Sequence, residues 1–261
     1  MEQLKVFAKY RYLLLNLIER DLKVKYRRSA LGLIWSVLNP LLMMLVQFIV
    51  FNTIFKNTIE NFAVYLIAGN LIFQFFSEGT QTAMSSVLGA APLIKKVYVP
   101  KYIFPLEKVL FSLVNTLFCG IALVIVAIAT NLTISWNILF IPVPLLLAML
   151  FNLGVGLILA TCVVFFRDIM HLYGVLIMAL TYFTPLFYDE SLIRDTAPAI
   201  VYQFLRVNPL YWYVAMFREV ILYANAPTAQ QMLICSAWSV VMLVVGLIVF
   251  RKAQDKFILY V

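Results

Sequence analysis

The sequence predicts an all-α integral membrane protein, and two observations predict it. Between Val109 and Phe166, 58 consecutive residues carry no charged side chain. The hydrocarbon core of a bilayer is about 30 Å thick and takes roughly 20 helical residues per crossing, so this run is long enough for two crossings. The composition agrees, because 64% of the residues are hydrophobic and only 12% are charged. That is about half the charged share of a soluble domain.

Six apolar segments are expected to cross the membrane as helices within one domain, 1–261. In chain order they are Leu31–Phe55, Asn61–Ser86, Phe104–Thr130, Trp136–Phe166, Ile169–Tyr188 and Met232–Phe250. An even number of crossings places both termini on the same side. We expect 1–30 to be an interface helix, 31–188 the first five spans, 189–231 a separate pair of short helices, and 232–261 the sixth span with its tail.

The basic residues predict which side holds the termini, because Lys and Arg gather in cytoplasmic loops. The first 30 residues carry eight of them: Lys5, Lys9, Arg11, Arg20, Lys23, Lys25, Arg27 and Arg28. Further ones follow in the second and fourth loops and in the tail, namely Lys95, Lys96, Lys101, Arg167, Arg251, Lys252 and Lys256. Both termini are therefore expected in the cytoplasm. Topology explains the net charge of +8, so no nucleic-acid partner is expected.

The N-terminal segment predicts an amphipathic helix that lies in the membrane interface. Its apolar residues fall on one face at helical spacing: Leu4, Phe7, Ala8, Leu14, Leu15, Ile18 and Leu22. Arg11 falls in the same stripe, and snorkelling to the headgroups explains that position.

The sequence lacks the residue combinations that are typical of catalytic and metal sites. His171 is the single histidine, and no Gly-x-x-x-x-Gly-Lys-Ser/Thr loop is present to bind ATP. The three cysteines, Cys119, Cys162 and Cys235, sit in apolar runs and are interpreted as packing residues. We therefore expect no catalytic site, no metal and no cofactor in this chain.

The second predicted span carries a polar stripe at three- and four-residue steps. Its members are Asn70, Gln74, Ser77, Glu78, Gln81 and Ser85. Polar groups facing lipid are costly, so these must face protein or water. Hydrogen-bonded contacts between helices are an equally good explanation for Ser and Gln. Glu78 is a functional candidate, because an ionisable group inside a span marks a functional site by default.

Aromatic residues make up 15% of the chain, and some accompany polar ones on one helix face. A ring offers a flat apolar surface and, in Tyr, a hydroxyl, which suits sugars. Core packing and interfacial belts are the alternative, and they explain most individual rings. The candidate channel-lining residues are Phe48, Phe51, Asn52, Phe55, Asn70, Gln74, Glu78, Tyr173, Tyr182, Phe183, Phe187 and Tyr188.

Two loops are expected to do more than connect spans. A proline-bracketed cytoplasmic segment predicts a small docking helix near 92–100, formed by Pro92, Leu93, Ile94, Lys95, Lys96, Val97, Tyr98 and Pro100. The loop 189–231 is too long for a connector. It predicts two short re-entrant helices, Ala197–Arg206 and Leu210–Tyr223, as a lid over an outer pore. The lid candidates are Tyr202, Phe204, Tyr211, Trp212, Phe217 and Arg218.

Several motifs occur in the order found in one known family. They are Tyr26-Arg-Arg-Ser-Ala-Leu-Gly-Leu-Ile-Trp35 with Asn39-Pro40, Leu93-Ile-Lys-Lys-Val-Tyr-Val-Pro100, Phe166-Arg-Asp-Ile169, Thr184-Pro-Leu-Phe-Tyr188, and Asn208-Pro-Leu210 followed by Arg218. Through them, essentially the whole chain resembles the transmembrane subunits of ABC exporters that move O-antigen, teichoic acid and related polysaccharides. Each motif is weak alone, and together they are fairly specific.

The resemblance implies a homodimer in a bacterial cytoplasmic (inner) membrane, with two separate ATPase subunits that bind ATP and Mg. Leu93–Val99 would be the coupling helix, 1–25 the interface helix, and the short helices after Tyr188 the outer gate. The first and fifth spans would line a channel between subunits. The substrate would be a polysaccharide on a polyprenyl diphosphate lipid, as in lipopolysaccharide biosynthesis.

The basic residues near the cytoplasmic mouth are candidates for recognising that diphosphate: Arg11, Lys23, Lys25, Arg27 and Arg28. Attraction to anionic lipid is an equal alternative. Two other functions compete with polysaccharide export. One is an ABC exporter for a hydrophobic drug or lipid, and the other is a membrane-embedded enzyme acting on polyprenyl-linked sugars. The enzyme would need grouped acidic or His residues at one interface.

Overall fold

The computed structural model describes residues 2–26, 31–55, 59–97, 99–133 and 135–260. Side chains are described for these residues apart from 2–9, 26 and 53–55. No strand occurs in the described ranges. The helices in chain order are α1 (Glu2–Tyr26), α2 (Ile34–Phe55), α3 (Phe62–Gly89), α4 (Ala91–Ile94), α5 (Ile103–Ala129), η1 (Trp136–Phe140), α6 (Pro142–Phe165), α7 (Ile169–Phe183), α8 (Glu190–Thr196), α9 (Ala199–Val207), α10 (Pro209–Ile221), α11 (Ala229–Ala253) and η2 (Gln254–Leu259).

Five of the described helical segments are long and apolar enough to cross a membrane: α2, α3, α5, η1 with α6, and α11 with η2. The expected all-α membrane fold is therefore confirmed. The fifth expected span is shorter than predicted, because α7 has 15 residues and ends at Phe183 rather than Tyr188. Pro185 disfavours helical geometry at Thr184, which is extended at φ −106° and ψ 129°. At 1.5 Å per residue α7 is about 22 Å long.

Helix-end chemistry explains the other differences from the expected spans. The fourth begins as the 3₁₀ helix η1, and α6 starts at Pro142, where a proline is favoured in a first turn. The sixth starts earlier than Met232, because Thr228 and Gln231 form a capping box. In it the Gln231 backbone N–H donates to Thr228 Oγ1 at 3.2 Å, and the Thr228 N–H donates to Gln231 Oε1 at 2.9 Å.

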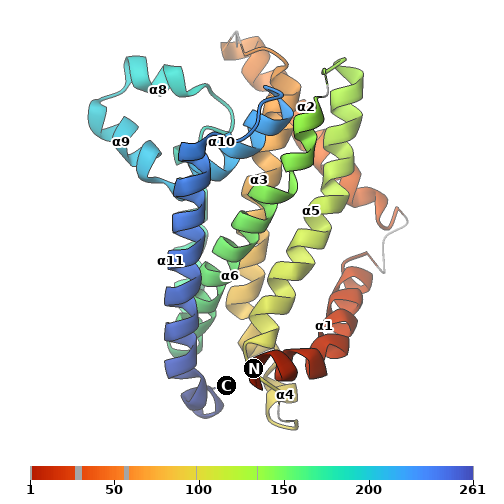
Figure 1. Cartoon of the computed structure of the whole chain (residues 1–261), viewed down its shortest axis with the longest axis vertical. Helices are drawn as coiled ribbons and strands as arrows, with labels where there is room; N and C mark the ends of the chain where they lie inside the picture. The colour runs from red at the N-terminus through yellow and green to blue at the C-terminus, as the bar shows by residue number, and fades with distance from the viewer. Residues whose placement is uncertain (1, 27–30, 56–58, 98, 134, 261) are drawn as a thin grey trace.

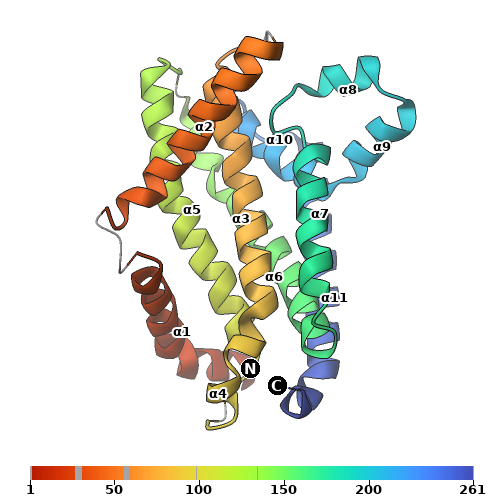
Figure 2. The ribbon, with the colours of Figure 1, turned by 180° about the vertical axis from the view of Figure 1, so that it is seen from behind.

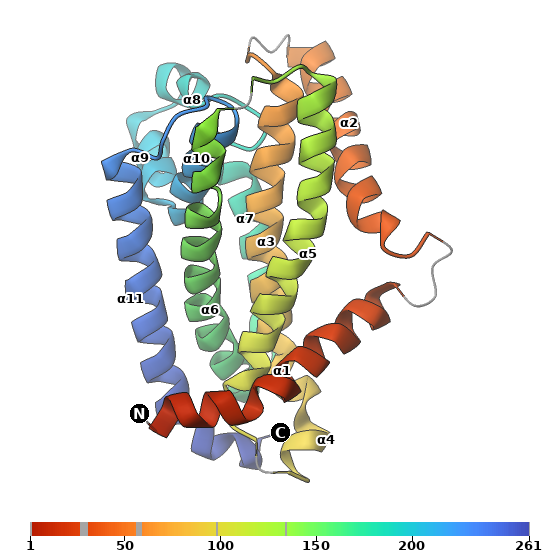
Figure 3. The ribbon, with the colours of Figure 1, turned by 45° about the vertical axis from the view of Figure 1, so that its right-hand side comes forward.

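Helix α3 is the centre of the bundle. It contacts α2, α5, α6, α7 and α10, and it is the most buried of the long helices. Side chains such as Val64, Ala68 and Phe75 are fully buried there. Figure 2 looks onto the side where α2, α3 and α7 lie, and Figure 3 shows α5 and α6 beside α3, with α11 next to α6.

The two ends of the bundle are built differently (Figure 1). One end, the α4 end, holds both termini, α4, η2 and helix α1, which lies across the bundle. The other, the α10 end, holds α8, α9 and α10. Helix α1 packs on the bundle through Leu14, Leu17 and Ile18. Leu15, expected on the same face, is 59% exposed, so the apolar face of α1 is narrower than the sequence predicts.

Helices α6 and α11 cross at very short range because two glycines face each other. A Cβ on Gly154 would lie 2.3 Å from the Met242 carbonyl carbon. One on Gly246 would lie 2.4 Å from the Gly154 oxygen. Small residues at such crossings let membrane helices gain close van der Waals packing.

Replacing Gly154 by alanine will push α6 and α11 apart, because the added methyl group meets backbone rather than a movable side chain. We expect the chain to lose about 1–3 kcal/mol of stability, measured by thermal unfolding in detergent. Gly174→Ala on α7 is the matched control, since a Cβ there meets nothing within 4 Å. Equal melting temperatures for the two variants would contradict this packing.

Candidate functional site

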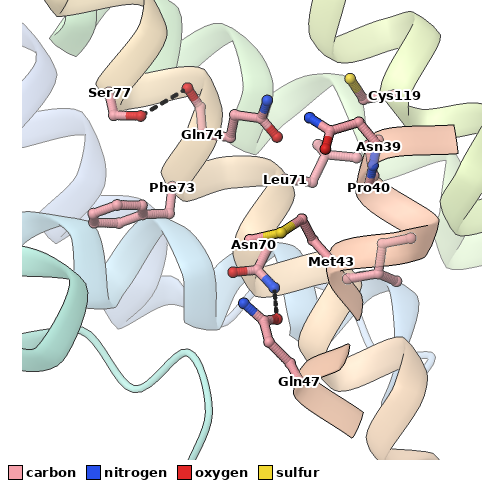
Figure 4. A pocket seen from close by; sticks show the side chains of 11 residues that line it. Asn39, Pro40, Met43, Gln47, Asn70, Leu71, Phe73, Gln74, Ser77 and Cys119 are labelled. Atoms are coloured by element: carbon pink, nitrogen blue, oxygen red, sulfur yellow. Dashed lines mark hydrogen bonds between the residues drawn. The ribbon is translucent and has the colours of Figure 1, made fainter. Parts of the chain in front are cut away.

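A polar seam runs between α2 and α3 in the middle of the bundle. We define it as Asn39 and Gln47 of α2 with Asn70, Gln74 and Ser77 of α3, which line a cavity of about 140 Å³ (Figure 4). Asn70 Nδ2 donates to Gln47 Oε1 at 2.5 Å, so the two helices are joined by an amide pair. The expected polar stripe on the second span therefore includes residues that join helices.

A second cavity of about 150 Å³ shares Asn39 and Gln74 with the first and reaches Lys25 and Asn115. Both cavities have amide side chains set among apolar ones. Neither is large enough for a sugar chain. The seam is consequently a contact between helices within one subunit.

The seam ends at Glu78, whose charge is fully partnered. Glu78 Oε1 accepts from Lys25 Nζ at 2.6 Å, and Oε2 accepts from Asn115 Nδ2 at 2.7 Å. Lys25 belongs to α1, so this ion pair ties the interface helix to the bundle. A second pair does the same one turn earlier, because Lys108 of α5 contacts Asp21. The sequence pointed to Glu78, and it did not identify Asn115 or the Asp21–Lys108 pair.

Several aromatic residues proposed to line a channel contact other side chains of the same subunit. Phe51 stacks on Phe187 with ring centroids 5.2 Å apart, and Phe48 packs against Phe62 at 6.0 Å. Tyr173 is buried and donates its hydroxyl to Thr80 at 2.6 Å. These contacts follow the alternative that the sequence left open, namely helix packing.

The other channel candidates reach the surface. Tyr182 and Phe183 are 66% and 47% exposed, and Asn52 is exposed on α2. Tyr188 is half-buried, and its hydroxyl donates to the Tyr182 carbonyl at 2.6 Å. Phe55 ends α2, and its side chain lies outside the described set.

The basic residues proposed to bind the diphosphate headgroup differ in whether their charge is paired. Lys25 is held by Glu78, and Lys23 pairs with Glu19 at 2.5 Å on the exposed face of α1. Arg11 is exposed and donates to the Tyr12 hydroxyl at 2.9 Å. Arg27 and Arg28 lie outside the described residues.

The expected docking helix is shorter than predicted, because α4 covers only Ala91–Ile94 and the chain turns over residues 95–97. Ile94 is buried against the bundle rather than exposed. The surface of this segment consists of Pro92, Lys95, Lys96 and Val97, with Leu93 and Pro100 half-buried. Tyr98 lies outside the described residues.

The α10 end holds three helices where the sequence predicted two, and Glu190 joins them. Tyr202 of α9 donates to Glu190 Oε1 at 2.7 Å, and Tyr211 of α10 donates to Oε2. The bond to Glu190 raises the pKa of Tyr202, and burial followed by the same carboxylate raises the pKa of Tyr211. Helix α8 begins at Glu190, and Asp189 caps it by accepting a hydrogen bond from the Ser191 N–H at 2.8 Å.

Other candidates at this end fall into buried and exposed groups. Trp212 Nε1 donates to the Arg206 carbonyl at 2.8 Å and is buried, as is Phe217. Phe204 is 64% exposed on α9. Burial of most of α10 sets it apart from α8 and α9, which are mainly exposed.

Arg218 holds the break after α7 in place. Its guanidinium is buried, lies 3.4 Å from the Tyr65 ring centroid, and donates to the carbonyls of Tyr65, Pro185 and Leu186 at 2.7–3.2 Å. Gly69 makes room for it, because a Cβ there would lie 2.3 Å from Arg218 Nη2. The sequence predicted Arg218 as a lid residue and did not identify Tyr65 or Gly69. The small size of Gly69 becomes informative only when Arg218, which is distant in the chain, is known to lie opposite it.

These features define a multi-pass helical membrane protein with polar contacts inside its bundle. Within the described residues, no group of three or more His, Cys, Asp or Glu side chains is arranged to hold a metal ion. The chain belongs to the ABC-2 type transporter family, whose model matches residues 12–222. It is thus a transporter component, and the resemblance seen in its motifs is confirmed.

The chain is also similar over nearly its whole length to characterised relatives. One is an O-antigen export system permease protein RfbA from Myxococcus xanthus, 29% identical over 248 residues that cover 95% of each chain. Another protein of that name, from Klebsiella pneumoniae, is 30% identical over 251 residues, covering 94% of this chain and 93% of the relative.

Removing the Arg218 guanidinium will take the donor from the Leu186 carbonyl, and one donor each from the Tyr65 carbonyl of α3 and the Pro185 carbonyl, which also accepts from the Tyr65 hydroxyl at 3.3 Å. Each unsatisfied buried group costs about 1–3 kcal/mol, so Arg218→Gln should lower stability by several kcal/mol, measured by thermal unfolding in detergent. Arg194→Gln is the control, because Arg194 is exposed and pairs with its neighbour Asp195. If both variants unfold at the same temperature, Arg218 does not hold the break.

A double-mutant cycle on Lys25→Gln and Glu78→Gln will give a coupling of about 1 kcal/mol or more, because both side chains are largely shielded, at 34% and 18% exposure. The same cycle on Lys23 and Glu19 should give a coupling near zero, because these side chains are 72% and 62% exposed. Chemical denaturation in detergent measures both. Equal coupling in the two cycles would refute the link between α1 and α3.

Proposed function

We propose that this chain is the membrane-spanning subunit of an ATP-driven exporter for a polyprenyl-diphosphate-linked polysaccharide such as an O-antigen, a teichoic acid or a similar cell-surface glycan. The family match supports the transporter class. Its relatives are O-antigen export system permease proteins, which supports the substrate class, and the similarity covers 94–95% of this chain.

The observation that carries the proposal is a polar strip on the surface of α3. Gln81 and Ser85 are exposed, and Gln74 and Ser77 are half-exposed on the same side of the helix. On one side of the strip, Thr80 bonds Tyr173 of α7. On the other side, Glu78 bonds α1 and α5. Hydrocarbon has no hydrogen bonds to offer these groups, so the strip faces water or a passing polar substrate.

A second copy of the chain completes the passage in this proposal. The two cavities along the seam are far too small for a glycan. A homodimer that brings two α2, α3 and α7 sides together encloses a path lined by the α3 strips and by exposed rings such as Tyr182 and Phe183 (Figure 2). Flat rings and amide groups bind successive sugars weakly enough to let them move.

The α4 end is the cytoplasmic end in this arrangement, and it carries the exposed Lys95 and Lys96. Two copies of a cytoplasmic ATP-binding cassette subunit, which bind ATP and Mg, dock there on the segment around α4. Helix α7, extended by residues 184–188, serves as the fifth of the six crossings in chain order. Helices α8–α10 form the outer gate, with the Glu190 contacts holding its parts together.

The diphosphate of the substrate enters beside α1 in this proposal. Arg27 and Arg28 are the strongest candidates for binding it, together with the exposed Arg11 and Lys23. Lys25 is assigned a structural part, because its ion pair with Glu78 ties α1 to α3.

Export will depend on the strip even though it makes no contact that holds the fold. Gln81→Leu makes the middle of this surface apolar, which lipid would tolerate and a sugar path would not. We expect glycan export to fall about tenfold, equal to about 1.4 kcal/mol on the barrier. The measurement is surface-glycan staining in a strain deleted for the gene and complemented with each variant.

Gln230→Leu, on the exposed first turn of α11, is the matched control and should leave export unchanged. Unaltered export in Gln81→Leu, with normal membrane insertion, would remove the strip from the path. ATPase stimulation of the complete transporter by drugs or lipids, but not by lipid-linked glycan, would favour a small-molecule exporter.

A further inference from the structure

A cavity of about 370 Å³ lies at the α4 end, apart from the α2–α3 seam. Helices α1, α3, α4 and α5 enclose it, and Figure 3 shows α1 crossing the bundle beside α4 and the start of α5. Its walls include the apolar Leu17, Leu93 and Phe104 and the charged Arg20, Glu107 and Lys108. At this volume it reaches the size range of small-ligand sites.

The charged side chains at this cavity form a chain of alternating sign. Arg20 Nη2 lies 2.8 Å from Asp21 Oδ1, Lys108 contacts Asp21, and Lys108 Nζ lies 3.3 Å from Glu107 Oε2. Two bases and two acids balance, so the cavity offers both signs of charge side by side. A ligand that carries both signs matches this arrangement better than a simple anion or cation.

Glu107 has an oxygen that the described residues leave without a partner. Its side chain is 2% exposed, and Oε1 accepts no hydrogen bond. A buried polar atom in this state costs free energy until a donor reaches it. Lys108 contacts the other oxygen, so a bound group or a water molecule that reaches Oε1 can supply the missing donor.

We propose that this cavity binds the headgroup of a phospholipid that carries a phosphate and a primary ammonium, as phosphatidylethanolamine does. The phosphate lies at Arg20 and Lys108, which supply charged donors. The ammonium donates to Glu107 Oε1. Leu17, Leu93 and Phe104 pack against the glycerol and the first methylene groups of the acyl chains.

The position of the cavity fits a lipid better than a soluble ligand. Helix α1 lies across the end of the bundle on its apolar face, which is the depth of lipid headgroups for an amphipathic helix. A lipid held there joins α1 and α4 to α3 and α5. It therefore couples the order of the α4 segment to the composition of the membrane.

A polyprenyl diphosphate is the other phosphate-bearing lipid to consider. It carries several negative charges and no ammonium, so Asp21 and Glu107 oppose it and Oε1 stays unsatisfied. The two sources share the phosphate and differ in the amine, which gives the experiment its contrast.

The test compares phosphatidylethanolamine with phosphatidylcholine, which keeps the phosphate and the positive charge and lacks the ammonium N–H donors. The full chain in detergent is equilibrated with equal amounts of the two lipids, and the retained lipid is measured by native mass spectrometry. We expect at least about tenfold preference for phosphatidylethanolamine, equal to about 1.4 kcal/mol. Glu107→Gln should abolish the preference, and Glu60→Gln, exposed at the far end of the bundle, should keep it.

Arg20→Gln separates the two halves of the headgroup. It should weaken retention of both lipids and leave their ratio unchanged, because it removes a phosphate contact only. Equal retention of the two lipids by the unmodified chain, or an unchanged preference in Glu107→Gln, overturns the proposal. So does displacement of phosphatidylethanolamine by farnesyl diphosphate, because the cavity then belongs to the exported lipid.

Discussion

The polar groups of α3 need partners inside a bundle surrounded by hydrocarbon, and these partnerships hold the other helices around it. Gln47 of α2 bonds Asn70, Lys25 of α1 and Asn115 of α5 bond Glu78, and Tyr173 of α7 bonds Thr80. Asn152 of α6 donates to the Phe75 carbonyl, and Arg218 of α10 donates to that of Tyr65. Each neighbouring helix thus satisfies a group that lipid could not, which sets its register along α3.

The two ends of the molecule use this constraint differently. At the α10 end, the buried Arg218 guanidinium holds the break after α7, and the half-buried Glu190 carboxylate joins α8 to α9 and α10. At the α4 end, ion pairs connect α1 to the bundle across a cavity that still contains an unsatisfied carboxylate oxygen. The first end is complete in itself. In the lipid proposal, a phospholipid headgroup from the membrane supplies the missing donor at the α4 end.

The exposed strip of Gln81 and Ser85 on α3 gives the transport proposal its physical basis. Some polar groups of the same helix join it to other helices, and others lie on its surface, where Gln81 is exposed and Ser85 Oγ donates to the Thr82 carbonyl of its own helix at 3.2 Å. A transporter subunit needs both, because its fold must survive in lipid while one face stays wettable. The aromatic residues divide accordingly, with Phe51 and Tyr173 in packing and Tyr182 and Phe183 on the surface.

The sequence by itself determined the membrane class and the ends of the five long apolar helices to within a few residues, and it pointed to Glu78, because long uncharged runs and an isolated carboxylate have few physical explanations in lipid. Its motifs also identified the family. Only the tertiary structure decided where α7 ends, that Ile94 faces inward, and which polar residues meet. Lys25 and Glu78, or Tyr65 and Arg218, are far apart in the chain, and local spacing carries no signal of such pairs. Whether a ring packs or lines a surface depends on the neighbouring helices, which periodicity along one helix cannot specify.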